Sequence, residues 1–120
     1  MNFRNLDVYR LAIRFVGIAA RCTKSIPIGH SDLGDQLRRA SLSVPLNIAE
    51  GSGRMKAPDQ RRYYSIARGS AMECAAIIDA CAELDFLEEP ALEESIAMLT
   101  SIVRMLSKLA LDRPIPAPKA

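Results

Sequence analysis

The stretch PDQRRYYSIARGSAMECAAIIDACAEL, residues 58–84, carries the strongest fold signal in this chain. Apolar and small side chains recur in it at alternating intervals of four and three residues: Tyr63, Ala67, Ser70, Cys74, Ile77, Cys81 and Leu84. This heptad spacing puts them on one side of an α-helix, and Pro58 suits its first turn. The many alanines and Gly69 allow a second helix to approach closely. The stretch therefore predicts a long helix with a tightly packed partner.

The partner follows at once in the sequence. After residues 85–89, Pro90 begins a second heptad pattern, formed by Leu92, Ile96, Leu99, Val103, Leu106 and Ala110. Two such patterns joined by a short loop predict an antiparallel helical hairpin. The segment 112–120 contains three prolines, and we expect it to form an extended, flexible tail outside a single domain of residues 1–111.

A third helix is predicted at about residues 5–24, before Pro27 and Gly29. Its polar stripe is narrow, because nearly everything between the stripe positions is apolar or Ala: Asp7, Arg10, Arg14, Gly17, Arg21 and Lys24. A helix packed on one side needs an apolar arc only ~100° wide. We therefore expect this helix to be covered twice, by its own bundle and by another subunit.

Between these elements lies a fourth helix that starts after Ser31, a suitable N-cap residue. Pro45 removes a backbone donor and clashes with the Ser41 carbonyl, which predicts a kink or a restart. Gly51 suits a left-handed cap at the helix end. The prediction is an all-α fold: an antiparallel, up-down four-helix bundle with a proline-kinked second helix.

Composition limits the classes of function. The chain is 49% hydrophobic and 25% charged, so it resembles an ordinary globular domain, and no charge-free stretch is long enough to span a membrane. Cys22, Cys74 and Cys81 form no C-x-x-C pair, which disfavours zinc and disulfides. With no signal sequence at Met1, we expect a cytoplasmic protein. His30 is the only histidine, and a single loop histidine predicts no metal, no cofactor and no catalysis.

Charge is distributed unevenly along the chain. Residues 1–68 contain twelve basic and five acidic residues, a net charge of +7, and the remainder carries −5. Two groups of basic residues could contact RNA or DNA. One lies around the loop before Pro58, beside Tyr63 and Tyr64, and the other lies along the helix predicted at about residues 5–24: Arg54, Lys56, Arg61 and Arg62, and Arg10, Arg14, Arg21 and Lys24. The alternative is a protein-assembly scaffold in which basic and acidic faces meet between subunits.

Polar residues cluster in an unusual way around Pro45: Gln36, Arg39, Ser41, Ser43, Asn47 and Glu50. Ser and Asn compete for backbone groups, so Asn47 or a serine could satisfy the carbonyl that Pro45 frees. Glu50 could pair with Arg39 or Arg54. The cluster is therefore either a structural device within the helix or a ligand site.

The run QLRRASLSVPLNIAEGSGR, residues 36–54, resembles the signature of the four-helix-bundle family named after 23S rRNA intervening sequences. That family also includes the accessory variability proteins of diversity-generating retroelements. Flanking positions match as well: Phe3, Leu6, Val8, Tyr9, Tyr64, Ala67, Gly69, Ser70 and Glu73. The similarity covers roughly residues 3–111 and includes Pro45 and Gly51.

This resemblance implies a protomer that assembles into a homopentameric ring or barrel and has no enzyme activity. Some relatives bind nucleic acid and a reverse transcriptase through a basic surface. The family name records a genomic location, so it does not make this chain a ribosomal protein.

Overall fold

The structure, a computed structural model, describes residues 1–111, which are all-α and contain no strand. Its four long helices are α1 Asp7–Lys24, α2 Ser31–Ser52, α3 Ala57–Glu83 and α4 Glu89–Ala110. Short 3₁₀ helices precede α1 and α2, at Asn2–Asn5 and Ile28–His30. The predicted all-α fold with four helices is confirmed. The tail predicted at 112–120 lies outside the described residues.

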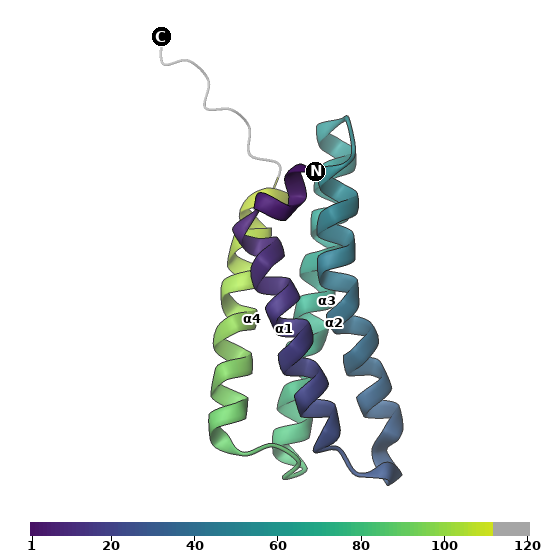
Figure 1. Cartoon of the computed structure of the whole chain (residues 1–120), viewed down its shortest axis with the longest axis vertical. Coiled ribbons are helices and arrows are strands. Elements are labelled where there is room, and N and C mark those ends of the chain that lie inside the picture. Colours follow the sequence, from purple (N-terminus) through teal and green to yellow (C-terminus); the bar gives the residue numbers. More distant parts are fainter. Residues whose placement is uncertain (112–120) are drawn as a thin grey trace.

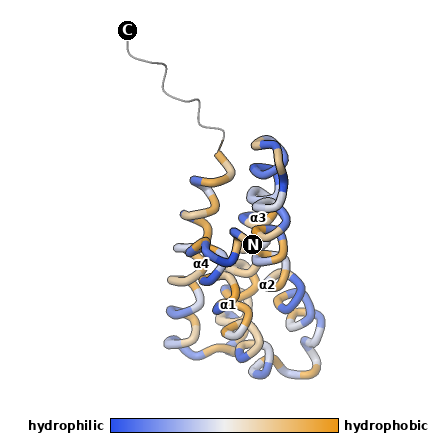
Figure 2. Tube along the Cα trace, turned by 45° about the horizontal axis from the view of Figure 1, so that its top comes forward, coloured by the Kyte–Doolittle hydropathy of each residue, from blue (hydrophilic) through white to orange (hydrophobic). Residues whose placement is uncertain are grey.

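The helices form a bundle in which α2 packs against α1 and α3, and α4 packs against α3 and α1. Figure 1 shows the α1–α2 and α3–α4 connections at one end and the α2–α3 turn at the other. The α2–α3 turn lies beyond the start of α1, because α2 and α3 are both longer than α1. Figure 2 shows hydrophilic positions gathered at that turn, whereas α4 is mostly hydrophobic.

Every helix contributes large side chains to a single core. The most deeply buried include Phe15 of α1, Leu37 and Ile48 of α2, Ile78 of α3, and Leu106 of α4. Burial of apolar surface of this kind contributes roughly 25 cal/mol per Å² and is the main force holding the helices together.

The heptad patterns locate the helices correctly but misplace parts of their buried faces. In α3, Ala67, Cys74 and Ile77 are buried as predicted, whereas Tyr64 is buried instead of Tyr63 and Leu84 is 47% exposed. An α-helix drifts by ~20° per heptad from a strict 3.5-residue repeat, so the contact face moves along a helix of this length. In addition, α3 packs on both α2 and α4, which widens its buried arc.

In α4 the fully buried face is displaced from the predicted pattern. The buried residues are Ser95, Leu99, Ile102 and Leu106, so only two of them belong to the predicted set. The other predicted positions, among them Ile96 and Val103, are half-buried at the edge of the bundle.

The protomer itself covers part of the apolar surface of α1, and the further cover expected from another subunit stays a prediction. The buried residues of α1 face α2 and α4, so one protomer covers two sides of the helix. Small residues account for much of the remaining surface, and Ile13, at 45% exposure, is the large hydrophobic residue that α1 leaves exposed. The narrow polar stripe therefore reflects a position between two helices.

The structure decides part of one prediction for α2 and corrects another. The helix continues through Pro45, which is buried inside it, so the restart is wrong and the kink stays a prediction. Ser31 is the first residue of the helix and makes no side-chain cap bond; His30 occupies the N-cap position. A single missing backbone bond is tolerated here because the rest of α2 is held by packing on α1 and α3.

Gly51 lies within α2, and no glycine of residues 1–111 has positive φ, so the predicted left-handed cap is wrong. The reason for glycine is proximity. A Cβ at this position would lie 3.0 Å from Tyr63 Cβ, 3.0 Å from Tyr64 Cε1 and 3.1 Å from the Gln60 carbonyl oxygen. Gly51 thus lets α2 and α3 meet closely beside their turn.

Candidate nucleic-acid interface

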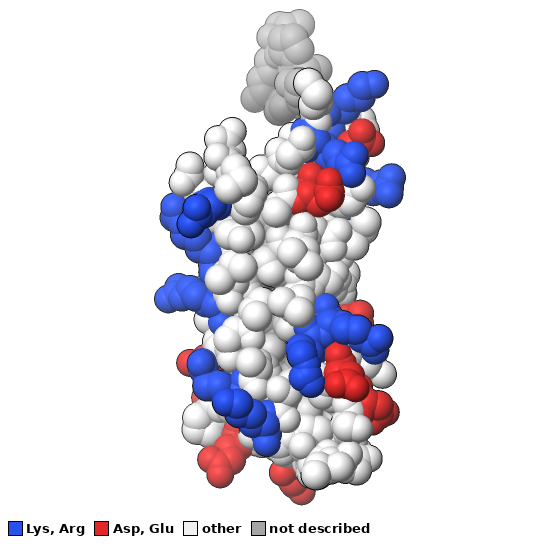
Figure 3. Space-filling view, turned by 45° about the vertical axis from the view of Figure 1, so that its right-hand side comes forward, with Lys and Arg blue, Asp and Glu red and all other residues white. Residues whose placement is uncertain are grey.

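The eight predicted basic residues form two groups that the fold does not merge. Arg10, Arg14, Arg21 and Lys24 are exposed along α1, whereas the others lie around the α2–α3 turn. In the turn group, Arg54, Lys56 and Arg62 are exposed and Arg61 is half-buried. Figure 3 shows Lys and Arg side chains on this face in separate groups, most with Asp or Glu beside them.

Tyr63 organises the cations of the α2–α3 turn. The Arg54 guanidinium lies 4.7 Å from the centre of its ring, and the Arg62 guanidinium lies 5.3 Å away. Arg54 also donates a 2.8 Å hydrogen bond to the Tyr63 hydroxyl and forms a 2.9 Å ion pair with Glu50. The predicted pairing of Glu50 with one of two arginines is thereby resolved in favour of Arg54.

Neither tyrosine is a free platform for stacking a base. Tyr63 is half-buried and flanked by the two arginines, and Tyr64 is only 8% exposed. Burial raises the pKa of the Tyr64 hydroxyl, although a hydrogen bond with Ser52 opposes the shift. The turn therefore offers cationic groups that suit phosphates and no exposed ring that suits base stacking.

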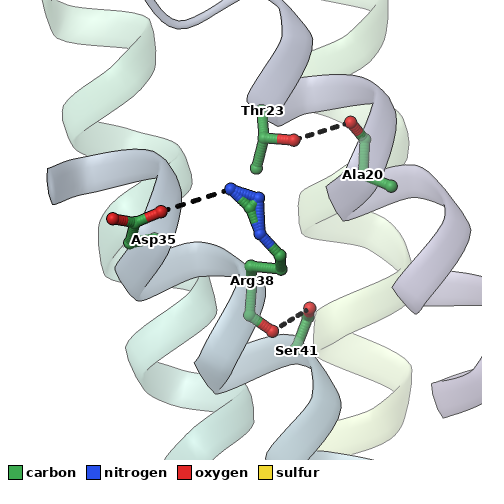
Figure 4. A network of polar contacts seen from close by, with 5 residues as sticks. All are labelled: Ala20, Thr23, Asp35, Arg38 and Ser41. Carbon is green, nitrogen blue, oxygen red and sulfur yellow. Dashed lines mark hydrogen bonds and ion pairs between the residues drawn. The ribbon is translucent and has the colours of Figure 1, made fainter. Parts of the chain in front are cut away.

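Several arginines are paired with acids on their own helix. Arg10 lies 3.5 Å from Asp7, and Arg38 lies 3.3 Å from Asp35. Figure 4 shows the Arg38 guanidinium next to Thr23 of α1. Exposed pairs of this kind contribute only about 0–1 kcal/mol, so the pair with Asp7 holds Arg10 weakly and leaves it able to contact a phosphate.

The uneven charge of the sequence is also uneven in space. Seven acids lie around the α3–α4 turn: Asp79, Glu83, Asp85, Glu88, Glu89, Glu93 and Glu94. This acidic end of the bundle is opposite the end that carries the basic α2–α3 turn (Figure 1). The α3–α4 turn therefore repels a polyanion and the α2–α3 turn attracts one, although the last turn of α1, with Arg21 and Lys24, lies at the same end as the acids.

The polar motif around Pro45 is satisfied from within the protein. Asn47 Nδ2 donates to the Ser43 carbonyl at 2.8 Å and to its hydroxyl at 3.0 Å, and the Ser43 and Ser70 hydroxyls lie 2.8 Å apart. Ser41 donates to the Arg38 carbonyl at 2.9 Å (Figure 4). The amide of Asn47 thus binds the Ser43 carbonyl rather than the Ser41 carbonyl that Pro45 frees. Gln36 and Arg39 are exposed, away from these bonds.

These contacts connect α2 to α3 and identify the motif as part of the packing. Within residues 1–111, every buried side-chain nitrogen or oxygen has a hydrogen-bond partner. The buried serine of the motif, Ser41, therefore has its partner within the protein. The geometry therefore favours the structural interpretation of the motif over the ligand site.

Residues 4–108 match the protein family described as 23S rRNA-intervening sequence protein. The chain belongs to this family. Among solved structures, it is similar to a protein of unknown function from the S23 ribosomal protein family of Bacteroides thetaiotaomicron, with a TM-score of 0.78 and 17% identity. That likeness covers 86% of this chain and 97% of the other, and it shows the shared fold. A comparison with curated proteins gave no match.

This member of the 23S rRNA-intervening sequence family also carries basic residues that the sequence analysis missed. Arg68 donates from Nε to the Ser107 hydroxyl across the α3–α4 contact, at 2.7 Å. Arg104 and Lys108 are exposed on α4 beside Ser107. A usable signal was present, because α3 has no acid between Asp59 and Glu73 and α4 has none after Glu94.

The three thiols of this family member are buried, whereas His30 is exposed. Burial raises the pKa of the Cys22 and Cys81 thiols, and it raises that of Cys74 to about 12, helped by Glu73. These thiols stay protonated near neutral pH and are poor nucleophiles. The His30 ring packs against Phe86 with 4.9 Å between ring centres.

Residues 1–111 contain no group of three or more His, Cys, Asp or Glu residues placed to hold a metal ion. The helices of this part of the chain are also too short or too polar to cross a membrane.

Proposed function

We propose that this protein is a non-catalytic, cytoplasmic homo-oligomer that binds RNA or DNA through the basic α2–α3 turn and the basic stripe on α1. In this proposal the protomer is an antiparallel, up-down bundle, and a pentameric ring displays several copies of the basic turn. The observation that carries it is the separation of charge between the two ends of the bundle. Shielded thiols and a histidine packed on Phe86 support the absence of catalysis.

The charge separation gives the proposed contact a direction. A polyanion approaching the acidic α3–α4 turn is repelled, whereas Lys56 and Arg62 are exposed at the opposite end. Phosphate contacts release counterions, so affinity should fall steeply with salt. A ring of identical protomers would multiply weak contacts through effective concentration.

The test is a fluorescence-polarisation titration of structured RNA and of duplex DNA at several salt concentrations. The double variant Lys56→Gln/Arg62→Gln should weaken binding. It should also make the negative slope of log K against log salt shallower by roughly 2 units. Arg38→Gln, near the acidic end, is the matched control with a small effect. Absence of binding by the unaltered protein at low salt contradicts the proposal.

A second candidate is an assembly scaffold without a nucleic-acid ligand. Exposed hydrophobic residues favour it: Leu42 and Leu46 lie one turn apart on α2 with 44% and 66% exposure, and Ile66 of α3 is 41% exposed. We call Leu42, Leu46 and Ile66 the exposed hydrophobic band. Figure 3 shows that uncharged surface separates the groups of charged side chains on the face it draws. Such a band is suited to contact with another copy or with a partner protein, for which a reverse transcriptase is the family precedent.

Analytical ultracentrifugation of Leu46→Gln against Leu109→Gln tests the role of this band. If the band is a subunit interface, Leu46→Gln shifts the species toward the 13.2 kDa monomer and Leu109→Gln leaves the oligomer intact. A monomer formed by the unaltered protein at micromolar concentration excludes the ring. If the monomeric Leu46→Gln variant still binds nucleic acid, the scaffold without a nucleic-acid ligand is excluded.

A further inference from the structure

A cavity of about 280 Å³ lies between α3 and α4, near the end of α4, and none of the residues that line it belongs to the proposed α2–α3 contact. Ser65 and Arg68 line it from α3, and Ser107, Ala110 and Leu111 line it from α4. We call these five residues the α3–α4 notch. Two hydroxyls and a guanidinium therefore face one hollow on an otherwise apolar wall.

Arg68 has donors to spare in the notch. Its side chain is half-buried, and its Nε donates to the Ser107 hydroxyl at 2.7 Å. A guanidinium has five N–H donors, so this bond leaves the terminal nitrogens free to bind another group. Unlike Arg10, Arg38 and Arg54, Arg68 forms no ion pair with an acid of residues 1–111.

Ser107 is oriented by the same bond. Its oxygen accepts from Arg68, so its own proton remains available to donate to a ligand. Ser65 adds a second hydroxyl from α3, in the turn before Arg68. The convergent groups are thus donors, as an anionic oxygen requires.

The surroundings of the notch are cationic. Arg104 and Lys108 lie on α4 within one turn of Ser107, and neither helix has an acid over residues 60–72 or 95–111. Arg68 is thus the one cation that lines the notch, and Arg104 and Lys108 add two exposed positive charges nearby on α4. A dianion with several acceptor oxygens gains more from this arrangement than a singly charged carboxylate does.

From these contacts we propose that the α3–α4 notch binds one phosphate group. The terminal nitrogens of Arg68 donate to two phosphate oxygens, Ser107 and Ser65 donate to the others, and Arg104 and Lys108 neutralise the remaining charge. The phosphate can belong to a small phosphorylated compound or to a nucleic-acid backbone. The site shares no residue with the proposed α2–α3 contact, so either proposal can fail alone.

The first experiment is an NMR titration of the ¹⁵N-labelled full chain with inorganic phosphate, with chloride added to a parallel sample at equal ionic strength. Saturable shifts of the residue 65–68 and 107–111 amides with phosphate alone support the site. Arg68→Gln should lower the affinity about tenfold or more, and Ser107→Ala should lower it less. Arg4→Gln, at an exposed arginine outside both proposed contacts, should leave it unchanged. No saturable shift, or equal affinity in Arg68→Gln, overturns the proposal.

Two further variants keep the test decisive. If Arg68→Gln does not fold, as judged by its amide spectrum, Ser65→Ala and Arg68→Lys replace it, and unchanged phosphate affinity in both overturns the site. Asp112 is the next acid after Glu94 in the sequence and follows directly on Leu111 of the notch. The titration is therefore repeated with Asp112→Asn, which removes this negative charge. Absence of saturable binding in that background also counts against the site.

The second experiment identifies the source of the phosphate. If Arg68→Gln weakens binding of RNA or DNA as well as of inorganic phosphate, the group comes from a nucleic-acid backbone. If it abolishes phosphate binding and leaves nucleic-acid affinity unchanged, the ligand is a small phosphorylated compound. Both results support a phosphate site, and failure of the α2–α3 variants to affect nucleic acid contradicts only the earlier proposal.

Discussion

The contact between α2 and α3 is closed, whereas the contact between α3 and α4 opens into hollows. On the first side, Gly51 lets the helices meet and the Ser43–Ser70 bond links them. On the second side there are two hollows, the notch at Arg68 and a cavity of about 400 Å³ beside Ala75 and Ala76. Small residues thus lie at both contacts of α3, with opposite results: Gly51 of α2 at the first, and Ala75 and Ala76 of α3 at the second.

The difference shows that small residues alone do not decide how closely helices pack. Gly51 lies where two tyrosines fill the space above it, so removal of a side chain brings the backbones together. Ala75 and Ala76 lie beside Val103 and Thr100 of α4, and the space there stays open. A closed contact is suited to stability, whereas an open one can receive a ligand or partner.

The largest expected effect concerns the apolar part of the α3–α4 contact. Leu106 is completely buried, so Leu106→Ala should lower the free energy of unfolding by about 2–5 kcal/mol through lost burial and a new cavity. Leu109→Ala, on the same helix but at 36% exposure, should cost under ~1 kcal/mol. Urea denaturation at fixed protein concentration measures both. Equal losses of stability in the two variants would mean that Leu106 is no more a core residue than Leu109.

The second largest effect is expected at the close contact between α2 and α3. Gly51→Ala places a Cβ 3.0 Å from both tyrosines and should destabilise the protein by about 1–3 kcal/mol despite better helix propensity. Gly69→Ala is the matched control, because nothing lies within 4 Å of its Cβ position. That substitution should stabilise α3 by about 0.5–1 kcal/mol. Thermal unfolding that shows the same sign for both changes would contradict the close approach of α2 and α3.

A smaller loss is expected at the polar motif. Asn47→Ala removes the bonds to the Ser43 carbonyl and hydroxyl and should cost about 1 kcal/mol. Thr100→Ala, which removes a bond from an exposed side chain to the Ile96 carbonyl, is the control and should cost less. The measurement is again urea unfolding. If the two losses are equal, the motif adds little to the closed contact.

The smallest effect is a dependence on alkaline pH. The pKa of Cys74 is about 12 in the folded protein, above its ordinary value of 9.0. The unfolded thiol therefore loses its proton first, so stability is constant below pH ~9 and falls as pH rises toward 12. At pH 9.5 the fall should be under ~1 kcal/mol. Cys74→Ala should show a smaller decrease between pH 8 and 9.5 in reducing buffer, and an equal decrease would contradict the shift.

The sequence predicted the helices well and the site less well. Proline and glycine positions located all four helices, because these residues affect the backbone locally. Misplaced positions such as Tyr63 and Leu84 arose because a heptad pattern assumes a single partner, whereas α3 has two. Arg68 was missed for another reason: its only sign in the sequence was the lack of acids around it, and Ser107 lies 39 positions away.

What the sequence by itself determined is the order of four helices, the separation of charge and the motif that marks the family. Each depends on the type and spacing of residues along a short stretch. Only the tertiary structure decided that Gly51 permits close packing, that Asn47 is satisfied internally and that Arg68 faces a hollow. Those roles depend on which side chains from a second helix come within 3 Å, and no single helix carries that information.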